Sequence, residues 1–253
     1  MLFRSTELGR EIRAAFVANK GCVLLASDYS QIELRLLAHF SEDELLVEAF
    51  RRGDDIHELT ATAVFGVPAQ EQTLEHRRRA KAINYGIVYG ISPFGLAQQI
   101  GTPQSEAEEF INEYFNRYQG VRRFIDSTIA EVRRTQEVRT FSGRRRRIPD
   151  ISTKDYNARG FAERTAINTP LQGGAADLIK LAMIRIQREL RERKLRSRMI
   201  LQVHDELVLE VPRDEVEPAA QIVREGMEQA YSFRVPLVAE VAVGPNWRDM
   251  EGG

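Results

Sequence analysis

The stretch "VHDELVLEV" at residues 203–211 places adjacent acids, Asp205 and Glu206, inside an apolar run. The flanking segments, "MILQV" (199–203) and "ELVLEV" (206–211), have the apolar and β-branched composition that is typical of strands. We therefore predict a β-hairpin whose turn carries two carboxylates. Acids held against other negative groups repel each other, and a bound cation or a proton relieves that repulsion.

Two further segments have the pattern of strands. "CVLLASD" (22–28) reads as a buried strand that ends at Asp28, and "PLVAEVAVG" (236–244) reads as a final strand. Strands thus occur near both ends of the chain, whereas the middle is mostly helical. The fold class that we predict is α+β, an antiparallel sheet assembled from the two ends with a large helical insertion. If the first strand neighbours the hairpin, Asp28 and Asp205 meet at one edge of the sheet.

Apolar periodicity and capping residues predict the helices. The expected helices are 30–40, 43–52, 55–65, 71–89, 105–118, 121–135, 157–168, 170–194 and 216–231. A small hairpin is expected at 137–149, with its turn at Ser142–Gly143.

Composition sets limits on the function. The chain has 253 residues, a formal net charge of −1 and one cysteine, Cys22, so an internal disulfide is excluded and a cytoplasmic location is favoured. The start, "MLFRSTELGREIR" (1–13), is too charged for a signal peptide, and no apolar run is long enough to span a bilayer. Arginines cluster at 77–81 and 143–147, which indicates either a basic groove or ordinary solvated surfaces.

Paired carboxylates at a sheet edge indicate a metal site. Mg²⁺ prefers oxygen ligands and usually completes its shell with water and substrate phosphates. Two such ions about 3.5–4 Å apart serve phosphoryl transfer. The alternative is that Asp28 merely ends a strand and that Asp205 and Glu206 form an ordinary polar turn.

The helix predicted at 71–89 carries a row of cations and aromatic rings. Arg77, Lys81, Tyr85 and Tyr89 recur every four residues and share one face. At about 1.5 Å per residue, Arg77 and Tyr85 lie roughly 12 Å apart, the length of a nucleotide. The alternative is an amphipathic helix with tyrosines in the core and arginines along its edge.

Three segments carry a family resemblance. "ASDYSQIELRLLAH" (26–39), "RRRAKAINYGIVYG" (77–90) and "QVHDELVLEV" (202–211) resemble, in order, the three signature motifs of family A DNA polymerases. The similarity includes "ERTAINTPLQGGAADLIK" (163–180) and extends from about residue 4 to residue 247.

The resemblance implies roles for the residues at the sheet edge. Asp28 and Asp205 match the two metal-binding carboxylates, and the backbone carbonyl of Tyr29 matches a further ligand. Two Mg²⁺ ions are expected, with Mn²⁺ as a substitute. Glu206 matches a neighbouring acid that supports catalysis. His204 matches a residue near the primer terminus, or it is a histidine that orients the turn.

The resemblance also implies a nucleotide-binding set. Lys81 is expected to bind the triphosphate together with Arg77 and to protonate the leaving pyrophosphate. Tyr89 matches the aromatic residue at the insertion site, and Glu33 matches the gate that excludes a 2′-hydroxyl. Tyr85 stands where many bacterial members have Phe, and its hydroxyl resembles the form that tolerates dideoxynucleotides. The expected set is Gln31, Glu33, Arg77, Lys81, Tyr85 and Tyr89.

Contacts with primer and template are expected from a third group. Arg164, Asn168 and Gln172 recur at four-residue intervals and can face one groove of a duplex, together with His204 from the hairpin. As an alternative, Asn168 simply closes one helix just before Pro170.

The family implies a palm that carries the metals and helical fingers that bind the nucleotide. We expect palm at 1–41, fingers at 42–155 and palm at 156–253. Met1 precedes Asp28 by only 27 residues, so neither the family's thumb nor its exonuclease domain is expected in this chain.

The predicted function is template-directed addition of deoxynucleotides to a primer, with weak processivity. The expected partners are primer–template DNA, deoxynucleoside triphosphates and a separate thumb-containing polypeptide, without a membrane. The alternative is a module that binds primer–template or nucleotide with negligible turnover. A single-subunit RNA polymerase shares related motifs, but Glu33 at the sugar gate argues against it.

Overall fold

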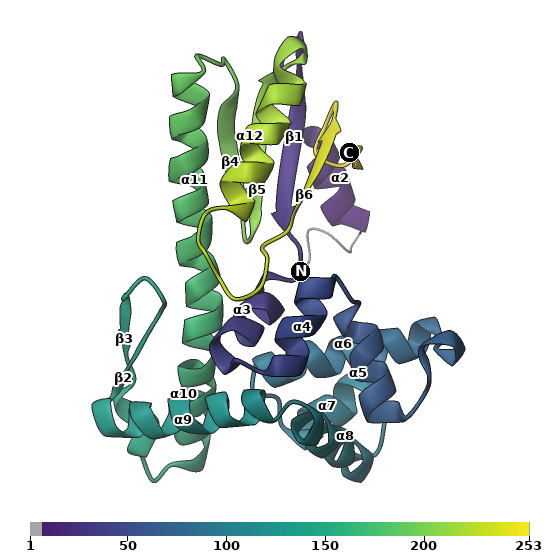
Figure 1. Cartoon of the computed structure of the whole chain (residues 1–253), viewed down its shortest axis with the longest axis vertical. Coiled ribbons are helices and arrows are strands. Elements are labelled where there is room, and N and C mark those ends of the chain that lie inside the picture. The colour runs from purple at the N-terminus through teal and green to yellow at the C-terminus, as the bar shows by residue number, and fades with distance from the viewer. Residues whose placement is uncertain (1–6, 253) are drawn as a thin grey trace. The chain divides into compact units, whose positions relative to one another are not determined.

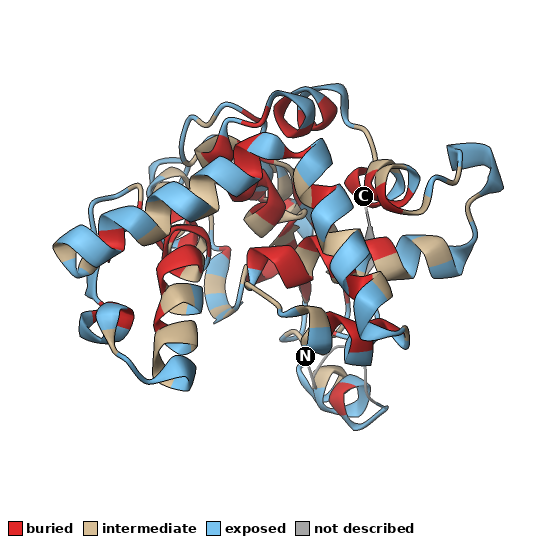
Figure 2. Ribbon diagram, turned by 90° about the horizontal axis from the view of Figure 1, so that it is seen from below, coloured by how far each residue is buried: buried red, intermediate tan, exposed pale blue. Residues whose placement is uncertain are grey.

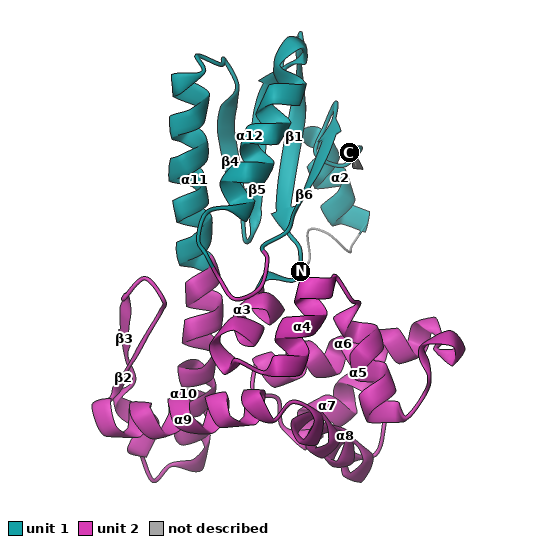
Figure 3. Cartoon of the chain, viewed as in Figure 1, with its two compact units in different colours: residues 1–32, 176–232, 237–253 teal, residues 33–175, 233–236 magenta. Residues whose placement is uncertain are grey.

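The computed structural model describes residues 7–252, with side chains up to residue 250. The chain is drawn in Figure 1, and Figure 3 shows its two compact units. Unit 1 comprises residues 1–32, 176–232 and 237–253, and unit 2 comprises residues 33–175 and 233–236. The first six residues of the start that was predicted not to be a signal peptide lie outside the described residues.

Unit 1 contains an antiparallel sheet built from both ends of the chain. Within the described residues its strand order is β4 (Arg198–Val203), β5 (Glu206–Pro212), β1 (Cys22–Tyr29), β6 (Ala239–Gly244) and β7 (Glu251–Gly252). The predicted α+β class, with strands 22–28 and 206–211 in one antiparallel sheet, is confirmed. β1 lies at the centre and pairs with β5 on one side and β6 on the other.

Both faces of β1 are covered, because residues that alternate along it point in opposite directions and yet are buried. On one face, α12 (Val216–Glu228) packs against β1, β5 and β6. On the other face, Leu24 forms an apolar cluster with Val208 and Trp247. Unit 1 also contains α2 (Glu7–Ala15), which was not predicted, and most of α11 (Gly174–Glu192).

Unit 2 is largely helical. Its helices, in chain order, are α3 (Ile32–Ser41), α4 (Glu44–Arg52), α5 (Ile56–Phe65), α6 (Leu74–Val88), α7 (Pro93–Ile100), α8 (Gln104–Arg117), α9 (Gln119–Thr135) and α10 (Tyr156–Asn168). A two-stranded hairpin, β2 (Glu137–Arg139) and β3 (Arg145–Arg147), follows α9 as predicted. Short turns of 3₁₀ helix occur at Ala69–Glu71, Pro149–Ser152 and, in unit 1, Arg213–Glu215. Figure 2 shows helices that are buried on one side and exposed on the other, as amphipathic helices are.

Capping residues explain where several helices begin. Asp43 and Asp55 accept hydrogen bonds from the first turns of α4 and α5, close to the predicted starts. The predicted helix at 71–89 begins only at Leu74, because Thr73 forms a capping box with His76. α7 was missed because Ser92–Pro93 was read as an interruption. Ser92 instead accepts a hydrogen bond from Gly95, and proline is well suited to the first helical position.

The two compact units divide the chain at residues 32/33 and 175/176, whereas the predicted palm and fingers divide it at 41/42 and 155/156. The helices α3 and α10 therefore group with the other helices of unit 2. The assignment of palm and fingers stays a prediction. Across the described part of the chain, every helix is too short or too polar to cross a membrane.

Candidate active site

The register of the sheet determines which carboxylates of unit 1 lie opposite one another. Asp28 in β1 lies directly opposite Glu206 in β5. The backbone N–H of Tyr29 donates to the carbonyl oxygen of Asp205 at 3.4 Å, so the hairpin turn lies beside the end of β1. The predicted adjacency of the two strands is confirmed, and Asp28 and Asp205, both half-buried, come from neighbouring segments.

The residues around these two acids are held in different ways. His204 is exposed and has a φ of 56°, a left-handed conformation that is uncommon for a residue other than glycine. The side-chain amide of Gln202 donates to the carbonyl oxygen of His204 at 2.9 Å. Gln31, in the turn after β1, also has a positive φ. The hydroxyl of Tyr29 donates to the carbonyl oxygen of Met227 in α12, so the side chain of Tyr29 lies on the face of the sheet that α12 covers.

Glu206 is buried and bound by two donors from distant parts of the chain. Its Oε1 atom accepts from the guanidinium of Arg13 at 3.1 Å and from the indole N–H of Trp247 at 2.9 Å. Its charge is thus balanced by Arg13, whereas we expected bound ions to balance the charge of the acidic pair. Neither Arg13 nor Trp247 was predicted, because each is far from Glu206 in sequence and lies outside the three motifs.

The oxygen donors of unit 1 fit a hard cation. The predicted donor set consists of the carboxylates of Asp28 and Asp205 and the backbone carbonyl of Tyr29. Among the described residues, no group of three or more His, Cys, Asp or Glu side chains is arranged to hold a metal ion. This donor set suits Mg²⁺, because Mg²⁺ usually takes one or two carboxylates and completes its shell with water and substrate phosphates.

In unit 2, the predicted residues of α6 lie along the solvent side of the helix. Arg77 forms an ion pair with Asp55, the capping residue of α5, at 2.8 Å. Lys81 and Tyr85 line one hollow of about 290 Å³, together with Arg78, Arg79 and Gln99. The rings of Tyr85 and Tyr89 are nearly parallel, with centroids 6.4 Å apart. The Asp55 partner of Arg77 was not predicted, although the helix that begins next to Asp55 was.

Glu33 and Tyr89 are in direct contact. The hydroxyl of Tyr89 donates to Oε2 of Glu33 at 2.5 Å, and Gln172 is a further hydrogen-bond partner of Tyr89. Burial raises the pKa of Glu33 above its ordinary value, and the hydrogen bond from Tyr89 partly offsets this. Burial and the neighbouring Glu33 raise the pKa of Tyr89, which keeps its hydroxyl protonated as a donor. Three residues predicted from separate motifs are therefore neighbours.

Two of the predicted DNA-binding residues, Asn168 and Gln172, lie next to the arginine-rich hairpin. Asn168 is the last residue of α10, but Thr169 keeps helical φ and ψ angles, and a π-helical turn, Thr169–Gly173, follows directly and contains Gln172. The chain therefore does not leave the helical conformation before Pro170. Asn168 and Gln172 both line a hollow of about 330 Å³. Its remaining lining residues are Thr140, Arg144, Arg145, Arg146, Thr169 and Gly173. Within the described residues, the side-chain oxygen of Asn168 is buried without a hydrogen-bond partner. Such an atom is expected to accept a donor from a ligand or a water molecule.

The side chain of Arg164 packs against the turn that follows α6. A Cβ atom added to Gly90 would lie 3.0 Å from Cγ of Arg164. Gly90 also has a φ of 67°, a conformation that glycine adopts without strain. Arg164 therefore contacts the segment next to Tyr89, and Gln172 contacts Tyr89 itself.

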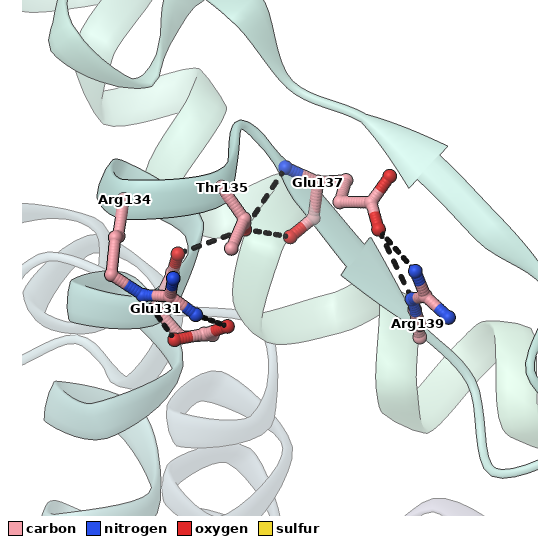
Figure 4. Close-up of polar contacts among 5 residues, drawn as sticks. All are labelled: Glu131, Arg134, Thr135, Glu137 and Arg139. Atoms are coloured by element: carbon pink, nitrogen blue, oxygen red, sulfur yellow. Dashed lines mark hydrogen bonds and ion pairs between the residues drawn. The ribbon is translucent and has the colours of Figure 1, made fainter.

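The base of the arginine-rich hairpin is tied to α9, as Figure 4 shows. The hydroxyl of Thr135 donates to the carbonyl oxygens of Glu131 and Glu137, both at 2.9 Å. Arg139 in β2 donates two hydrogen bonds to Glu137, and Arg134 donates two to Glu131. Of these bonds, those of the Thr135 hydroxyl join the end of α9 to β2, whereas the arginine bonds lie within α9 and within β2.

The nucleotidyltransferases that polymerise nucleic acids have carboxylates where the strands of an antiparallel sheet end. They also have a helix that carries cations and aromatic rings, and this chain has both features. A model of DNA polymerase family A matches residues 3–249, and the chain belongs to this family. The enzymes of this family are DNA-directed DNA polymerases and generally depend on divalent metal ions.

Individual relatives agree. The chain is 51% identical over 244 residues to DNA polymerase I of Geobacillus stearothermophilus, an alignment that covers 96% of this chain and 28% of that protein. It is 49% identical to DNA polymerase I of Bacillus subtilis, with the same coverage. Among solved structures, the POL domain of Pol1 from M. smegmatis, in complex with DNA primer–template and dNTP, superposes with a TM-score of 0.92 at 45% identity. That match covers 96% of this chain and 43% of the other. The chain thus spans about a quarter of the length of these curated relatives.

Proposed function

We propose that this chain carries out template-directed DNA synthesis, adding deoxynucleotides to the 3′ end of a primer. The observation that carries this proposal is that Asp28, near the end of β1, and Asp205, in the turn before β5, lie on neighbouring segments at the same end of the sheet. The family membership supports it, as does the structural relative in complex with primer–template and dNTP. We further propose that the chain acts in the cytoplasm.

Asp28 and Asp205, with the backbone carbonyl of Tyr29, would hold Mg²⁺, with two ions in the complete site and Mn²⁺ as a substitute. Bound Mg²⁺ supplies Lewis-acid stabilisation of charge on the phosphates and lowers the pKa of the attacking 3′-hydroxyl. The role of the two aspartates is to orient their oxygens at a fixed place on the sheet. Glu206, bound by Arg13 and Trp247, supports this arrangement.

Residues of α6 are proposed to bind the incoming triphosphate. Lys81 is exposed in a hollow that Arg78 and Arg79 also line, and it would bind phosphate oxygens and give a proton to the leaving pyrophosphate. Arg77 is paired with Asp55, so binding of a triphosphate requires it to exchange or share that carboxylate. A phosphate group carries more charge than one carboxylate and accepts the same forked pair of hydrogen bonds.

Glu33, Tyr85, Tyr89 and Gln31 are proposed to recognise the sugar and base. The bond from Tyr89 fixes the Glu33 carboxyl in one orientation, where it would exclude a 2′-hydroxyl by contact. The ring of Tyr85 lies beside that of Tyr89, and its hydroxyl is proposed to act in sugar recognition. Glu33 and Tyr85 would thus select deoxyribose because a 2′-hydroxyl does not fit beside them.

Primer–template DNA is proposed to contact Arg164, Asn168, Gln172 and His204. Asn168 and Gln172 share their hollow with three arginines of the hairpin, which supply positive charge for phosphates. We expect the 253-residue polypeptide assayed by itself to be weakly processive and to extend primers further when a thumb-containing polypeptide is added.

Primer extension with Mg²⁺ tests this function. Asp28→Asn and Asp205→Asn should each lower the rate on the order of 10³-fold or more, because each removes an ion-binding oxygen. The matched control is Asp126→Asn, an exposed acid paired with Arg122, which should extend primers like the wild type. Ribonucleotides offered alone should give no product, and efficient RNA synthesis would favour an RNA polymerase.

A wild-type polypeptide that binds primer–template but extends nothing, even with a thumb-containing polypeptide present, would contradict synthesis. That outcome would favour the binding module.

A further inference from the structure

We propose that Arg13 and Trp247 are positioning residues of the catalytic turn. They bind the buried carboxylate of Glu206 and thereby fix the backbone that carries Asp205 beside Asp28. The reaction affected is the one proposed above, so the inference rests on that proposed function. The contacts themselves lie within unit 1, and they can be tested without turnover.

The first argument is the geometry of the contact. Both donors, the guanidinium of Arg13 and the indole N–H of Trp247, converge on one carboxylate oxygen of Glu206, at 3.1 and 2.9 Å. Arg13 also stacks on the ring of Trp247, with its central carbon 4.1 Å from the ring centroid. The side chain of Arg13 is 13% exposed and that of Glu206 is 5% exposed. In such a desolvated place, charged hydrogen bonds are strong and breaking one of them is costly.

The second argument is charge. In the sheet register, Asp28 lies opposite Glu206 in β5 and opposite Glu240 in β6, so three acids form one row across three strands. Like charges directly opposite each other in a sheet repel. Arg13 supplies a permanent cation at one end of this row, so the turn can hold its shape before any metal ion arrives.

The third argument is the strain of the turn. The loop between β4 and β5 has two residues, and the first of them, His204, has a φ of 56°. Conformations of this kind persist where the surrounding structure holds them. Glu206 is the first residue of β5 and directly follows this loop. Anchoring its side chain therefore restrains the backbone of Asp205.

The fourth argument is that the two anchors are themselves fixed. The backbone N–H of Trp247 donates to the carbonyl oxygen of Phe16 at 3.0 Å, and Val17 forms an antiparallel bridge with Asn246. The rings of Phe16 and Trp247 meet edge to face. Segments near the two ends of the chain thus form one support beneath the turn.

This arrangement predicts which feature of Glu206 matters. If Glu206 acts as an anchor, its acceptor oxygen is needed and its charge is secondary. Glu206→Gln retains an acceptor for both donors and should lose less kcat than Glu206→Ala, because it preserves more of the geometry on which orientation depends. Glu206→Ala removes the acceptor and leaves Arg13 buried without its partner.

The experiment compares variants of the anchors with a matched control. Arg13→Met removes the cation, Arg13→Lys keeps it, and Trp247→Phe keeps the ring but removes the N–H donor. The control is Arg10→Met on the same helix, because Arg10 is exposed and pairs with Glu7. Two measurements are made on each variant: single-nucleotide extension, resolved into kcat and KM for the nucleotide, and amide hydrogen exchange of the segment 202–208.

Arg13→Met, Trp247→Phe and Glu206→Ala should lower kcat on the order of tenfold or more, because small displacements of catalytic groups have effects of this size. The KM for the nucleotide should change less than about twofold, since the triphosphate is proposed to bind other residues. Exchange in segment 202–208 should quicken in these variants and stay unchanged in Arg10→Met. Arg13→Lys should recover most of the lost kcat.

Two results would overturn the inference. One is wild-type kcat and exchange in Arg13→Met and Trp247→Phe. The other is a loss that follows the unfolded fraction, with faster exchange throughout unit 1, because that indicates general stability rather than positioning. If the wild type itself extends no primer, the proposed function fails, while the exchange data still decide whether Arg13 and Trp247 hold the turn.

Discussion

At the scale of single residues, Glu33 shows how a local environment sets the character of a carboxyl group. Burial raises its pKa above the ordinary value of 4.5, and the hydrogen bond from Tyr89 lowers it in part. Because the folded-state pKa lies above the unfolded value, this group contributes stability that is fully present below the unfolded pKa. That contribution is lost as the pH rises through the folded pKa.

Tyr89→Phe should therefore raise the pKa of Glu33 further. The substitution removes the donor that favours the ionised carboxylate but leaves the ring that buries it. The measurement is an NMR titration of the labelled side-chain carboxyl of Glu33 in the wild type and the variant, with Tyr231→Phe as the control. An unchanged or lower pKa of Glu33 in Tyr89→Phe would show that the hydrogen bond does not persist in solution.

At the scale of elements, a buried polar chain joins α5 to α6. The ring nitrogen Nδ1 of His57 lies 2.9 Å from the side-chain amide nitrogen of Asn84, which acts as donor. The amide oxygen of Asn84 accepts from Thr60 at 3.0 Å. Burial lowers the pKa of His57 to about 4, and the cations of Arg77 and Lys81 contribute to this. The imidazole is therefore neutral at pH 7. Hydrogen bonds between neutral side chains thus hold α6 against α5, close to Arg77 and Lys81.

Acidification should consequently weaken the packing of α5 on α6. The folded-state pKa of His57 is depressed, so its contribution is present above the ordinary value of 6.5 and is lost as the pH falls towards about 4. Between pH 7 and pH 4.5 the free energy of unfolding of the wild type should fall by about 2–3 kcal/mol more than that of His57→Gln. Urea denaturation at both pH values measures this.

The control for this prediction is Ser127→Ala, which changes an exposed side chain that does not titrate and should lose as much stability on acidification as the wild type. If His57→Gln and the wild type lose equal stability, the pKa of His57 is not lowered by folding, and His57 is protonated at pH 4.5 in the folded protein.

At the scale of the whole molecule, charge is distributed unevenly. The formal net charge is −1, yet the hollow beside Asn168 and Gln172 has Arg144, Arg145 and Arg146 in its lining. Local concentration of arginines attracts a polyanion even when the net charge is near zero. The prediction of a basic groove from the cluster at 143–147 is thus supported by where the hairpin places these side chains.

The affinity for primer–template should accordingly be sensitive to salt. Arg145→Gln and Arg146→Gln should each reduce the slope of log affinity against log salt by about 0.9 for every phosphate contact removed. The control is Arg134→Gln, an exposed arginine paired with Glu131, which should keep the slope. Fluorescence anisotropy over a range of salt concentrations measures it. Equal slopes in all three variants would place the DNA elsewhere.

Much of the fold could be predicted from local sequence. The strands 22–28 and 206–211, the hairpin turn between 203 and 206 and the capped helices α4 and α5 depend on apolar periodicity and on short-range hydrogen bonds. These signals lie within a few residues of each other. The motifs also led to candidate residues that the structure brings together within each unit, such as Glu33 with Tyr89 and Asn168 with Gln172.

Other features were decided only by the tertiary structure. The anchoring of Glu206 joins residues that are 193 and 41 positions away from it, and the Asp55 partner of Arg77 is 22 positions distant. No periodicity encodes such pairs, because their distance depends on how whole segments pack. The raised pKa of Glu33 and the lowered pKa of His57 arise mainly from burial. Burial is a property of the surrounding atoms, so the sequence by itself determined which residue types stand in the site, and packing determined their charge and orientation.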